Sequence, residues 1–458
     1  MIMEDEKEKH KHGRLRLVLV PTPFQGHLNP MLQLAATLES KGFLITIAQN
    51  RRLNSPNPRF DILSIEDKLS DEDMCSPDKP GIVLLLNANC EAPFQESLRK
   101  LIEEDEIGIG IGCIIYDESS YFAEAAAYNL KIRSMVFRTS NAITLLVRTT
   151  PTFRLRAQAR LPLPDPMSRE AAPEHPILRL KDLPISNFGS IQNFFKLLYI
   201  AMNIGSSKAI IWNTMTCLED SSLTQFKQQS QVPIFAIGPL HKRVPVSLST
   251  PSTFLEEDKS CITWLDKQSI NSVIYISIGS IVTSSEKDIA EMAWGLANSR
   301  QPFLWVIRPG SVRGSEWIEA LPEGFVESVG ERGCIVKWAP QREVLGHEAV
   351  GGFWSHCGWN STLESICEGV PLLCRPGFGD QKVTARFVSQ VWRVGLQLDN
   401  EMERGEIEKA VKSLMVDEQG KEMRQRAMEF KLKAELEIRE GGSSYNALND
   451  LVELICSF

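Results

Sequence analysis

The sequence predicts an α/β protein with two domains, each built on a doubly wound parallel β-sheet. The chain has 458 residues, more than a single hydrophobic core usually organises. Short apolar runs that suit β-strands alternate with helical segments, and this βαβα order is typical of parallel sheets with helices on both faces. The order breaks off in a stretch of proline, serine and threonine and then starts again, which indicates a second domain of the same kind.

The first half opens with an apolar strand at Leu15–Val20. Asn29 and Pro30 have the composition of a helix start, so we expect a helix from there to about Ser40. Residues 151–186 are rich in proline and charge, which indicates a surface insertion or lid. The other predicted elements of this half are a helix at Tyr121–Leu130 and strands at Phe43–Ala48, Phe60–Ile65, Cys113–Tyr116, Ser134–Phe137, Ala209–Asn213 and Pro233–Ile237.

The second half repeats the alternation. Its predicted strands are Ser272–Ser280, Phe303–Ile307, Cys334–Lys337, Val350–Trp354 and Gly395–Leu398, and its predicted helices include Ile289–Ser299, Thr362–Cys367 and Ala385–Trp392. We therefore expect two Rossmann-like domains with a cleft between them. The expected parts are a disordered charged N-terminus (1–14), an N-terminal domain (15–240), a linker (241–258), a C-terminal domain (259–440) and a terminal amphipathic helix (441–458).

Composition excludes several classes of function. A formal charge of −8 argues against nucleic acid as a partner. No apolar run reaches the length that a membrane span needs. The ten cysteines have irregular spacing without a CxxC pair, which is typical of free thiols in a reducing compartment. We expect a cytoplasmic protein that is a monomer.

The stretch from Trp338 to Gln381 predicts an anion site. An apolar strand is followed by the turn Ser355–Asn360, where Gly358 allows a sharp bend, and then by a helix. Such a turn directs free backbone N–H groups and the positive end of the helix dipole at a ligand above the sheet. His356, Asn360 and Ser361 could add side-chain donors. The alternative is that these polar residues only cap the helix.

His27 and Asp117 are the candidate catalytic pair. His27 follows the first strand and Asp117 the fourth, and these strands are neighbours where the winding of a 3-2-1-4-5 sheet reverses. Histidine is the usual general base near neutral pH, and a carboxylate behind it fixes the tautomer and stabilises the imidazolium. The alternative interpretation is a surface histidine and a helix-capping aspartate.

The whole chain resembles the plant family 1 UDP-glycosyltransferases. The family signature opens on Trp338, carries HCGWNS from His356 and closes on Asp380 and Gln381, and PFQGHLNP matches the segment that bears the family's base. IWNT, WLD, RPG and GGSS add to the resemblance, which is strongest to the branch of the cytokinin N-glucosyltransferases and the steviol-glycoside glucosyltransferase. The resemblance implies a GT-B fold with an acceptor-binding N-terminal domain and a UDP-sugar-binding C-terminal domain facing across the cleft, and a last helix that packs back on the N-terminal domain.

The resemblance also implies a role for each matching residue. His27 would be the base and Asp117 its partner, and Gln381 is the residue that the family associates with glucose. The implied UDP-sugar contacts are Trp338 on the uracil; Ala339 and Gln341 near base and ribose; Glu364 on the ribose hydroxyls; Gly279, Ser280, His356, Gly358, Asn360 and Ser361 at the diphosphate; and Thr139, Trp359, Asp380 and Gln381 at the sugar. The candidate acceptor pocket is Phe24, Ser120, Tyr121, Phe122, Phe378 and Gly379.

The implied reaction is an inverting transfer of glucose from UDP-glucose to a hydroxyl or amine. The acceptor would be a small lipophilic plant metabolite such as a cytokinin, a phenolic or flavonoid, or a terpenoid. UDP-glucose is a co-substrate, and no metal or other cofactor is expected. Two alternatives remain open: a catalytically inactive UDP-sugar-binding protein, and an NAD-dependent dehydrogenase, although the latter lacks its glycine-rich fingerprint after the first strand.

Two stretches resemble functional motifs but are not expected to be functional, and three positions differ from the sequence that is usual in the family. Asp71-Glu72-Asp73 spells a DxD metal motif, but we expect a solvated loop there, and Gly108–Gly112 precedes a strand and is expected to be a turn. Relatives usually carry tryptophan where this chain has Ser120 and asparagine where it has Thr384, and the loop after the second strand also differs. These departures weaken any transfer of acceptor contacts from the family.

Overall fold

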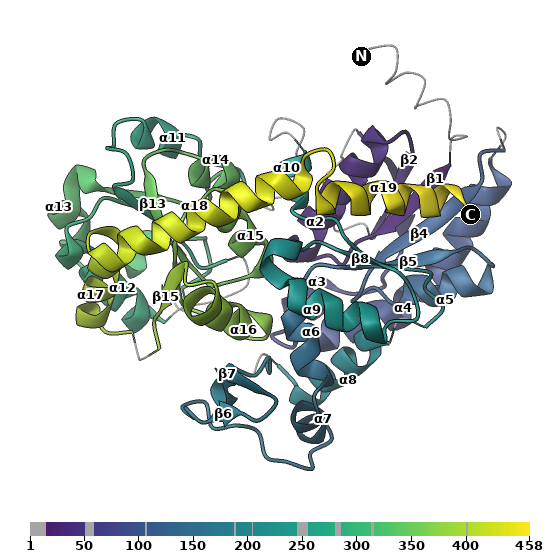
Figure 1. The fold of residues 1–458 in the computed structure, drawn as a ribbon, viewed down its shortest axis with the longest axis horizontal. Helices are drawn as coiled ribbons and strands as arrows, with labels where there is room; N and C mark the ends of the chain where they lie inside the picture. The colour runs from purple at the N-terminus through teal and green to yellow at the C-terminus, as the bar shows by residue number, and fades with distance from the viewer. Residues whose placement is uncertain are drawn as a thin grey trace. The chain divides into compact units, whose positions relative to one another are not determined.

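The computed structural model describes residues 15–50, 59–105, 108–186, 189–203, 205–244, 255–279, 285–312, 316–399 and 402–458 (Figure 1). The chain forms two compact units. Unit 1 contains residues 1–146, 186–252 and 437–458, and unit 2 contains residues 147–185 and 253–436. The predicted disordered segment 1–14 lies outside the described residues, as does most of the predicted linker.

Unit 1 is built on a seven-stranded parallel sheet in the order β3-β2-β1-β4-β5-β8-β9. The predicted order 3-2-1-4-5 is therefore confirmed, and β1 and β4 are neighbours with Val20 opposite Tyr116. The strands are β1 (Arg16–Val20), β2 (Leu44–Asn50), β3 (Asp61–Ile65), β4 (Ile111–Asp117), β5 (Ser134–Arg138), β8 (Ile210–Trp212) and β9 (Ile234–Ala236).

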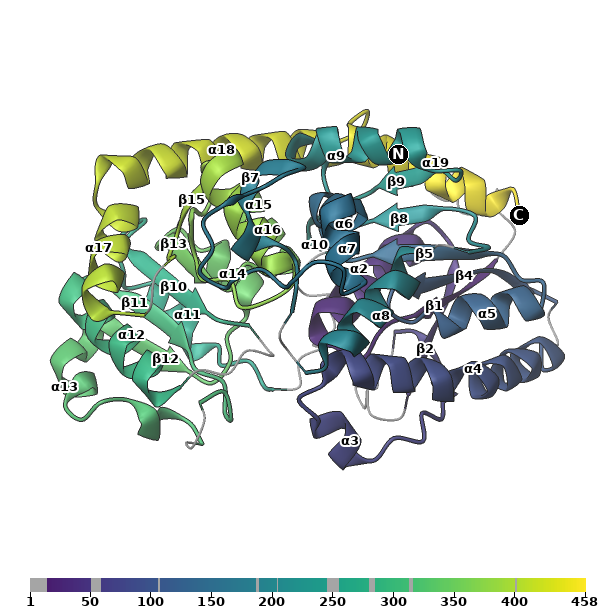
Figure 2. The same ribbon diagram turned by 90° about the horizontal axis from the view of Figure 1, so that it is seen from below.

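Helices cover both faces of this sheet (Figure 2). One core contains α2 (Gln25–Ser40) and α19 (Ser443–Cys456), and in it Leu448 and Leu451 are buried together with Leu17 and Leu19 of β1. The opposite core contains α4 and α5. The other helices of unit 1 are α3 (Asp71–Cys75), α4 (Lys79–Glu103), α5 (Phe122–Asn129), α6 (Ala142–Thr149, continuing into unit 2), α8 (Ile191–Met202), α9 (Thr216–Gln229) and α10 (Leu240–Arg243).

Unit 2 repeats this architecture with a six-stranded parallel sheet in the order β12-β11-β10-β13-β14-β15. Helices α12 and α17 pack on one face through a shared core. The strands are β10 (Val273–Ser277), β11 (Phe303–Val306), β12 (Gly333–Val336), β13 (Val350–Ser355), β14 (Leu372–Cys374) and β15 (Gly395–Gln397). The helices are α11 (Ser260–Leu265), α12 (Glu286–Ser299), α13 (Phe325–Val329), α14 (Gln341–Leu345), α15 (Trp359–Cys367), α16 (Asp380–Arg386), α17 (Arg404–Met415) and α18 (Glu418–Ile438).

The structure differs from the predicted elements in several places, among them the start of α16 at Asp380, five residues before the helix predicted from Ala385. Helix α2 begins at Gln25, five residues before Pro30, because the Phe24 carbonyl already accepts hydrogen bonds from the amides of His27 and Leu28. The DxD tract forms the short helix α3 instead of a loop, since Ser70 and Asp73 make a reciprocal capping box. Residues 147–185, expected inside the N-terminal domain, pack with unit 2. This segment contains α7 (Pro151–Ala157), β6 (Ala171–Ala172), β7 (His175–Arg179) and a 3-10 turn (Leu180–Asp182).

The described residues also limit how the chain meets a membrane and how its thiols are paired. None of their helices is long and apolar enough to cross a membrane. The cysteines that are described there are free thiols, and Cys90, Cys113 and Cys357 are among the buried ones.

Candidate active site

His27 and Asp117 meet at the carboxyl ends of β1 and β4. Since α2 begins early, His27 lies on its first turn, with a side chain that is 30% exposed, whereas Asp117 is fully buried. The His27 Nδ1 atom lies 2.8 Å from Asp117 Oδ2. Because an ionised carboxylate only accepts hydrogen bonds, Nδ1 carries the proton and Nε2 keeps its lone pair.

The carboxylate of Asp117 is fixed by further hydrogen bonds. Thr22 Oγ1 donates to Asp117 Oδ1 at 2.8 Å, and the Ser119 amide donates to the same oxygen at 2.9 Å. The Thr139 hydroxyl lies 3.2 Å from His27 Nδ1, so this residue, predicted at the sugar, contacts the imidazole. The imidazole therefore has one defined tautomer and orientation, which is the condition for a general base.

A pocket opens beside this pair in unit 1. It is small and partly open to solvent. Ser120 and Phe122, both predicted for the acceptor, line it, whereas Phe24 and Tyr121 do not. The other lining residues are mostly apolar and come from the ends of β1, β2 and β3, from the loop after β4 and from α4: Val20, Pro21, Thr22, Pro23, Ala48, Gln49, Ile65, Val83, Leu86, Asn87, Cys90 and Ser119.

Asn87 is a residue of this pocket that the sequence analysis missed. Its amide donates to the Ser119 carbonyl at 2.7 Å and accepts from the Phe122 amide at 2.8 Å. These two hydrogen bonds connect α4 to the loop that follows Asp117. Asn87 directly follows the apolar run 82–86 of this helix, and that position is the signal that could have indicated it, because a buried amide needs partners.

In unit 2, the predicted anion site is a strand, a turn and the N-terminus of α15. Gly358 is the N-cap and has no side chain, so the first amides of the helix have no side-chain cap. His356 lies between two glycine backbones: a Cβ on Gly279 would be 2.7 Å from His356 Nε2, and a Cβ on Gly358 would be 2.5 Å from it. Ser280, which follows Gly279, lies outside the described residues.

His356 is neutral at pH 7. Burial lowers the pKa of its imidazole to about 4, although the Ser277 backbone, which can accept a hydrogen bond from the charged ring, acts in the opposite direction. Its Nδ1 is buried and has no hydrogen-bond partner within the described part of the chain. A buried polar atom of this kind favours a ligand atom beside it.

This low pKa predicts acid-dependent stability. Between pH 6.5 and about 4, His356 binds a proton in the unfolded chain but not in the folded chain. The contribution of this residue to the free energy of unfolding is therefore complete above pH 6.5 and is lost as the pH falls toward 4. The whole loss is about 3 kcal/mol. Urea unfolding at pH 7.5 and pH 4.5 measures it, and His356→Gln should show a smaller difference between the two pH values. An equal difference in both proteins would contradict the prediction.

Gln341 and Glu364, both predicted for uridine, and Ser361, predicted for the diphosphate, form one hydrogen-bonded group. Gln341 Nε2 donates to Glu364 Oε2 at 2.7 Å and to Ser361 Oγ at 3.0 Å. Tyr275, buried in β10, donates to Gln341 Oε1 at 3.3 Å. The group therefore presents a carboxylate and hydroxyls in a fixed arrangement. Trp338, just past β12, is partly exposed, and Ala339 beside it is buried.

Helix α16 presents the residues predicted for the sugar. Gln381 Oε1 accepts hydrogen bonds from the backbone amides of Gly377 and Phe378 at 2.9 and 3.2 Å. The Nε2 donor of the same side chain therefore points away from this loop. Asp380 and Gln381 are the first residues of α16, and Gly379 is its N-cap. Trp359, in contrast, is buried against Trp392, so it can offer a ligand only its backbone at the start of α15.

Comparisons with known proteins show the family to which the chain belongs. The sequence model of a family described as UDP-glucoronosyl and UDP-glucosyl transferase matches residues 254–430. UDP-glycosyltransferase 76E1 of Arabidopsis thaliana is 48% identical over 440 residues, which cover 94% of this chain and 95% of that protein. Flavonol 3-O-glucosyltransferase UGT76E12 of the same plant is 46% identical over 95% of this chain and 96% of its own.

Solved structures of plant glycosyltransferases are also similar to this chain over nearly its whole length. Phytolacca americana UGT2, complexed with UDP-2fluoro-glucose and pterostilbene, is 27% identical, covers 97% of this chain and 99% of its own, and has a TM-score of 0.79. Medicago truncatula UGT71G1, complexed with UDP-glucose, is 25% identical over the full length of both chains with a TM-score of 0.78. Membership of the cytokinin and steviol branch stays a prediction. From its relatives and its two Rossmann-like units, this chain belongs to the plant family 1 UDP-glycosyltransferases and is an enzyme of the GT-B fold.

Proposed function

We propose that this enzyme transfers glucose from UDP-glucose, with inversion at the anomeric carbon, to a hydroxyl or amine of a small lipophilic plant metabolite. The observation that carries the proposal is the hydrogen-bonded pair of His27 and Asp117 beside a mostly apolar pocket. The names of two similar proteins, which mention a flavonol and pterostilbene, favour phenolic acceptors first.

In the proposed reaction His27 Nε2 accepts the proton of the acceptor as the acceptor oxygen or nitrogen attacks the anomeric carbon. The bond from that carbon to the diphosphate breaks on the opposite face, and UDP leaves. Asp117 stabilises the imidazolium that forms, and the buried hydrogen bonds from Thr22 and Ser119 hold the carboxylate in place.

The leaving diphosphate would be stabilised by the N-terminus of α15 and by neutral His356 acting as a hydrogen-bond donor. Ser361, Asn360 and the Gly279 backbone would add donors. Trp338 would stack on the uracil, Glu364 would hold the ribose hydroxyls, and Asp380 and Gln381 would hold the glucose. We propose that this set of donors makes a metal ion unnecessary; within the described residues no group of side chains suits one.

The test is an incubation of the protein with UDP-glucose and a panel of flavonols, stilbenes and adenine-type cytokinins, with and without EDTA. We expect UDP release in both conditions and a β-glucoside by NMR, since UDP-glucose is an α-linked donor. An α-glucoside would contradict inversion. UDP-glucose binding without release for any acceptor would favour the inactive binding protein, an alternative that the intact catalytic pair argues against.

Filling the pocket should separate acceptor from donor binding. Val83 lines the pocket and is 5% exposed, so Val83→Phe places a ring where the acceptor is proposed to bind. We expect the acceptor KM to rise about tenfold, the equivalent of about 1.4 kcal/mol, while the KM for UDP-glucose is unchanged. Steady-state kinetics with each substrate varied measures this, and equal changes in both KM values would argue against the assignment.

The compartment and the oligomeric state of the enzyme can be proposed as well. Buried free thiols such as Cys113 and Cys357 suit a reducing compartment, so we propose that the enzyme works in the cytoplasm. We further propose that it works as a monomer.

A further inference from the structure

Residues 147–185 form a segment, here called the insertion segment, that belongs to unit 2 although the chain before and after it belongs to unit 1. Part of it packs tightly: Leu178, Leu183 and Ile185 are each less than 5% exposed. Its β7 strand and 3-10 turn contact helix α16. This is the helix whose first two residues, Asp380 and Gln381, are proposed to hold the donor sugar.

Two different sides of α16 have different partners. Gln381 is 6% exposed and is hydrogen-bonded to the loop before the helix. Lys382 and Arg386, four residues apart and therefore on one side, bind the insertion segment. Lys382 Nζ donates to the Ile185 carbonyl at 3.4 Å, and Arg386 donates to the Ile177 carbonyl from Nε at 3.2 Å and from Nη2 at 3.0 Å.

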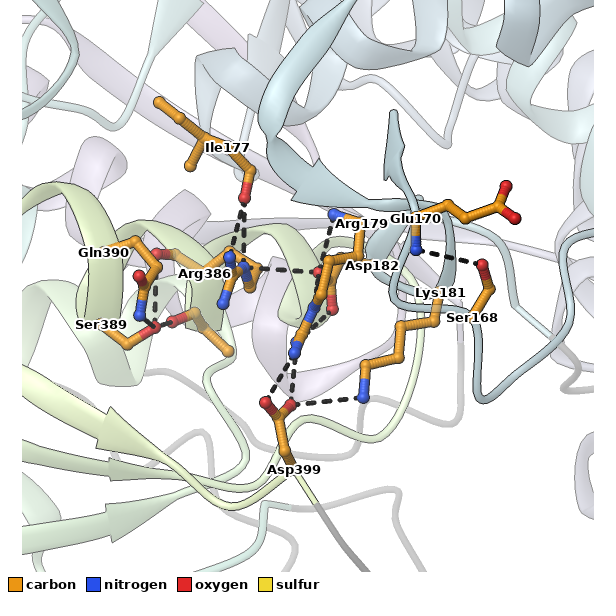
Figure 3. Close-up of polar contacts among 11 residues, drawn as sticks. Ser168, Glu170, Ile177, Arg179, Lys181, Asp182, Arg386, Ser389, Gln390 and Asp399 are labelled. Atoms are coloured by element: carbon orange, nitrogen blue, oxygen red, sulfur yellow. Dashed lines mark hydrogen bonds and ion pairs between the residues drawn. The ribbon is translucent and has the colours of Figure 1, made fainter. Parts of the chain in front are cut away.

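Charged residues extend this contact (Figure 3). Arg386 Nε lies 3.4 Å from Asp182 Oδ2, and Arg179 donates to the same carboxylate from Nε at 2.7 Å and from Nη2 at 3.0 Å. Arg179 also binds Asp399, just after β15, at 2.6 and 2.8 Å. We call Arg179, Lys181, Asp182, Arg386 and Asp399 the Arg179 cluster; Lys181 Nζ lies 3.5 Å from Asp399.

The cluster is stronger than an ordinary surface ion pair. The side chains of Arg179 and Asp182 are 12% and 4% exposed, and the guanidinium of Arg179 uses both its edges on carboxylates. Burial alone would lower the pKa of Arg179, but its hydrogen bonds to Asp399 and Asp182 outweigh burial and raise it. Partly buried bidentate pairs of this kind define a geometry as well as adding stability.

Helix α16 itself is short. Its seven residues are followed directly by a single π-helical turn, Phe387–Val391. So short a helix has little intrinsic stability, and its position depends on its packing partners. The Arg179 cluster holds the end of α16 opposite to Asp380, and a shift or rotation of the helix there would move both residues proposed for the sugar.

We propose that the insertion segment, through the Arg179 cluster, positions helix α16 and so sets the recognition of the donor hexose, with Arg179 and Asp399 as positioning residues. This rests on the proposed function, because it takes Asp380 and Gln381 as the sugar contacts. Uridine and diphosphate binding should not depend on the cluster, since their proposed residues lie after β10, β12 and β13 and on α14 and α15. The hydrogen bonds described for the cluster do not extend to these elements.

The experiment compares Arg179→Met, Arg179→Lys and Asp399→Asn with the wild-type enzyme. We measure kcat and KM for UDP-glucose and for its C4 epimer UDP-galactose, and the Kd of UDP by calorimetry. Arg179→Met should raise the KM for UDP-glucose about tenfold and reduce the preference for glucose over galactose about fivefold, with the Kd of UDP within twofold of wild type. Arg179→Lys keeps the positive charge, and Asp399→Asn keeps the shape of the carboxylate. Both variants should therefore show a smaller loss than Arg179→Met.

Arg404→Met is the matched control. Arg404 makes several hydrogen bonds to Glu291 in the same unit but has none to α16 or the insertion segment among the described contacts. It should leave the donor KM, the hexose preference and the Kd of UDP unchanged. If Arg179→Met instead weakens UDP and UDP-glucose equally, or leaves the hexose preference unchanged, the cluster only stabilises the fold and the inference is wrong. If wild-type enzyme transfers no glucose with any acceptor, the proposed function has failed first, whatever the variants do.

Discussion

Replacing His27 by alanine is expected to lower kcat by about 10² to 10⁴ while the affinity for UDP stays within twofold of wild type. The reason is that the imidazole supplies general-base catalysis, which contributes a factor of this size, and that it lies in unit 1, whereas the residues proposed for UDP lie in unit 2. Single-turnover rates of glucoside formation and calorimetric UDP binding measure the two quantities.

Asp117→Asn is the matched variant for this prediction. It keeps the size of the side chain but offers an amide where the 2.8 Å hydrogen bond needs an acceptor, so it should favour the wrong imidazole tautomer and lower kcat by a comparable factor. Thermal unfolding checks that both variants remain folded. Loss of UDP binding together with transfer would show that the pair is structural, and full activity of either variant would remove it from the mechanism.

Gly358→Ala is expected to weaken UDP binding about 30-fold, the equivalent of about 2 kcal/mol. Gly358 has φ −60°, so alanine suits its backbone, and the effect is purely steric: the new Cβ would lie 2.5 Å from His356 Nε2. Relief requires the imidazole or the start of α15 to shift, and overpacking of this kind costs about 1–3 kcal/mol. Both groups belong to the proposed diphosphate site, so the cost should appear as lost affinity, measured by UDP titration.

Gly405→Ala provides the comparison. Gly405 lies on the first turn of α17, and a Cβ there would meet nothing within 4 Å. Alanine is also the better helix former, so UDP affinity should be unchanged and stability slightly higher. Equal affinity of Gly358→Ala and wild type would mean that the ring of His356 has no role in the diphosphate site.

The catalytic pair is largely predictable from the sequence. Apolar runs identify the strands, and the rule that parallel α/β sheets bind ligands where the winding reverses brings His27 and Asp117 together across ninety residues of chain. The start of α2 is less predictable. Proline favours a first turn, but Leu28 and Met31 are buried at helical spacing on either side of Pro30, and their packing extends the helix past it.

The pocket and the insertion segment show what the sequence does not predict. The pocket combines single residues from several strand ends with one side of α4, and no periodicity indicates which side of that helix turns toward Asp117. In the same way, proline and charge mark residues 151–186 as a surface feature. What associates this segment with unit 2 is a set of contacts between residues far apart in the chain: Arg179 with Asp399, and Lys382 and Arg386 with backbone carbonyls of the segment.

The division of the chain has a practical consequence for chimeric enzymes. A recombination point in the linker is the simplest design for exchanging one substrate specificity while keeping the other. However, α19 contributes Leu448 and Leu451 to the core of unit 1, and residues 147–185 pack with unit 2. A single crossover would therefore combine each sheet with a packing element from the other parent, and hybrids that respect both cores need exchanges at all four borders between the units.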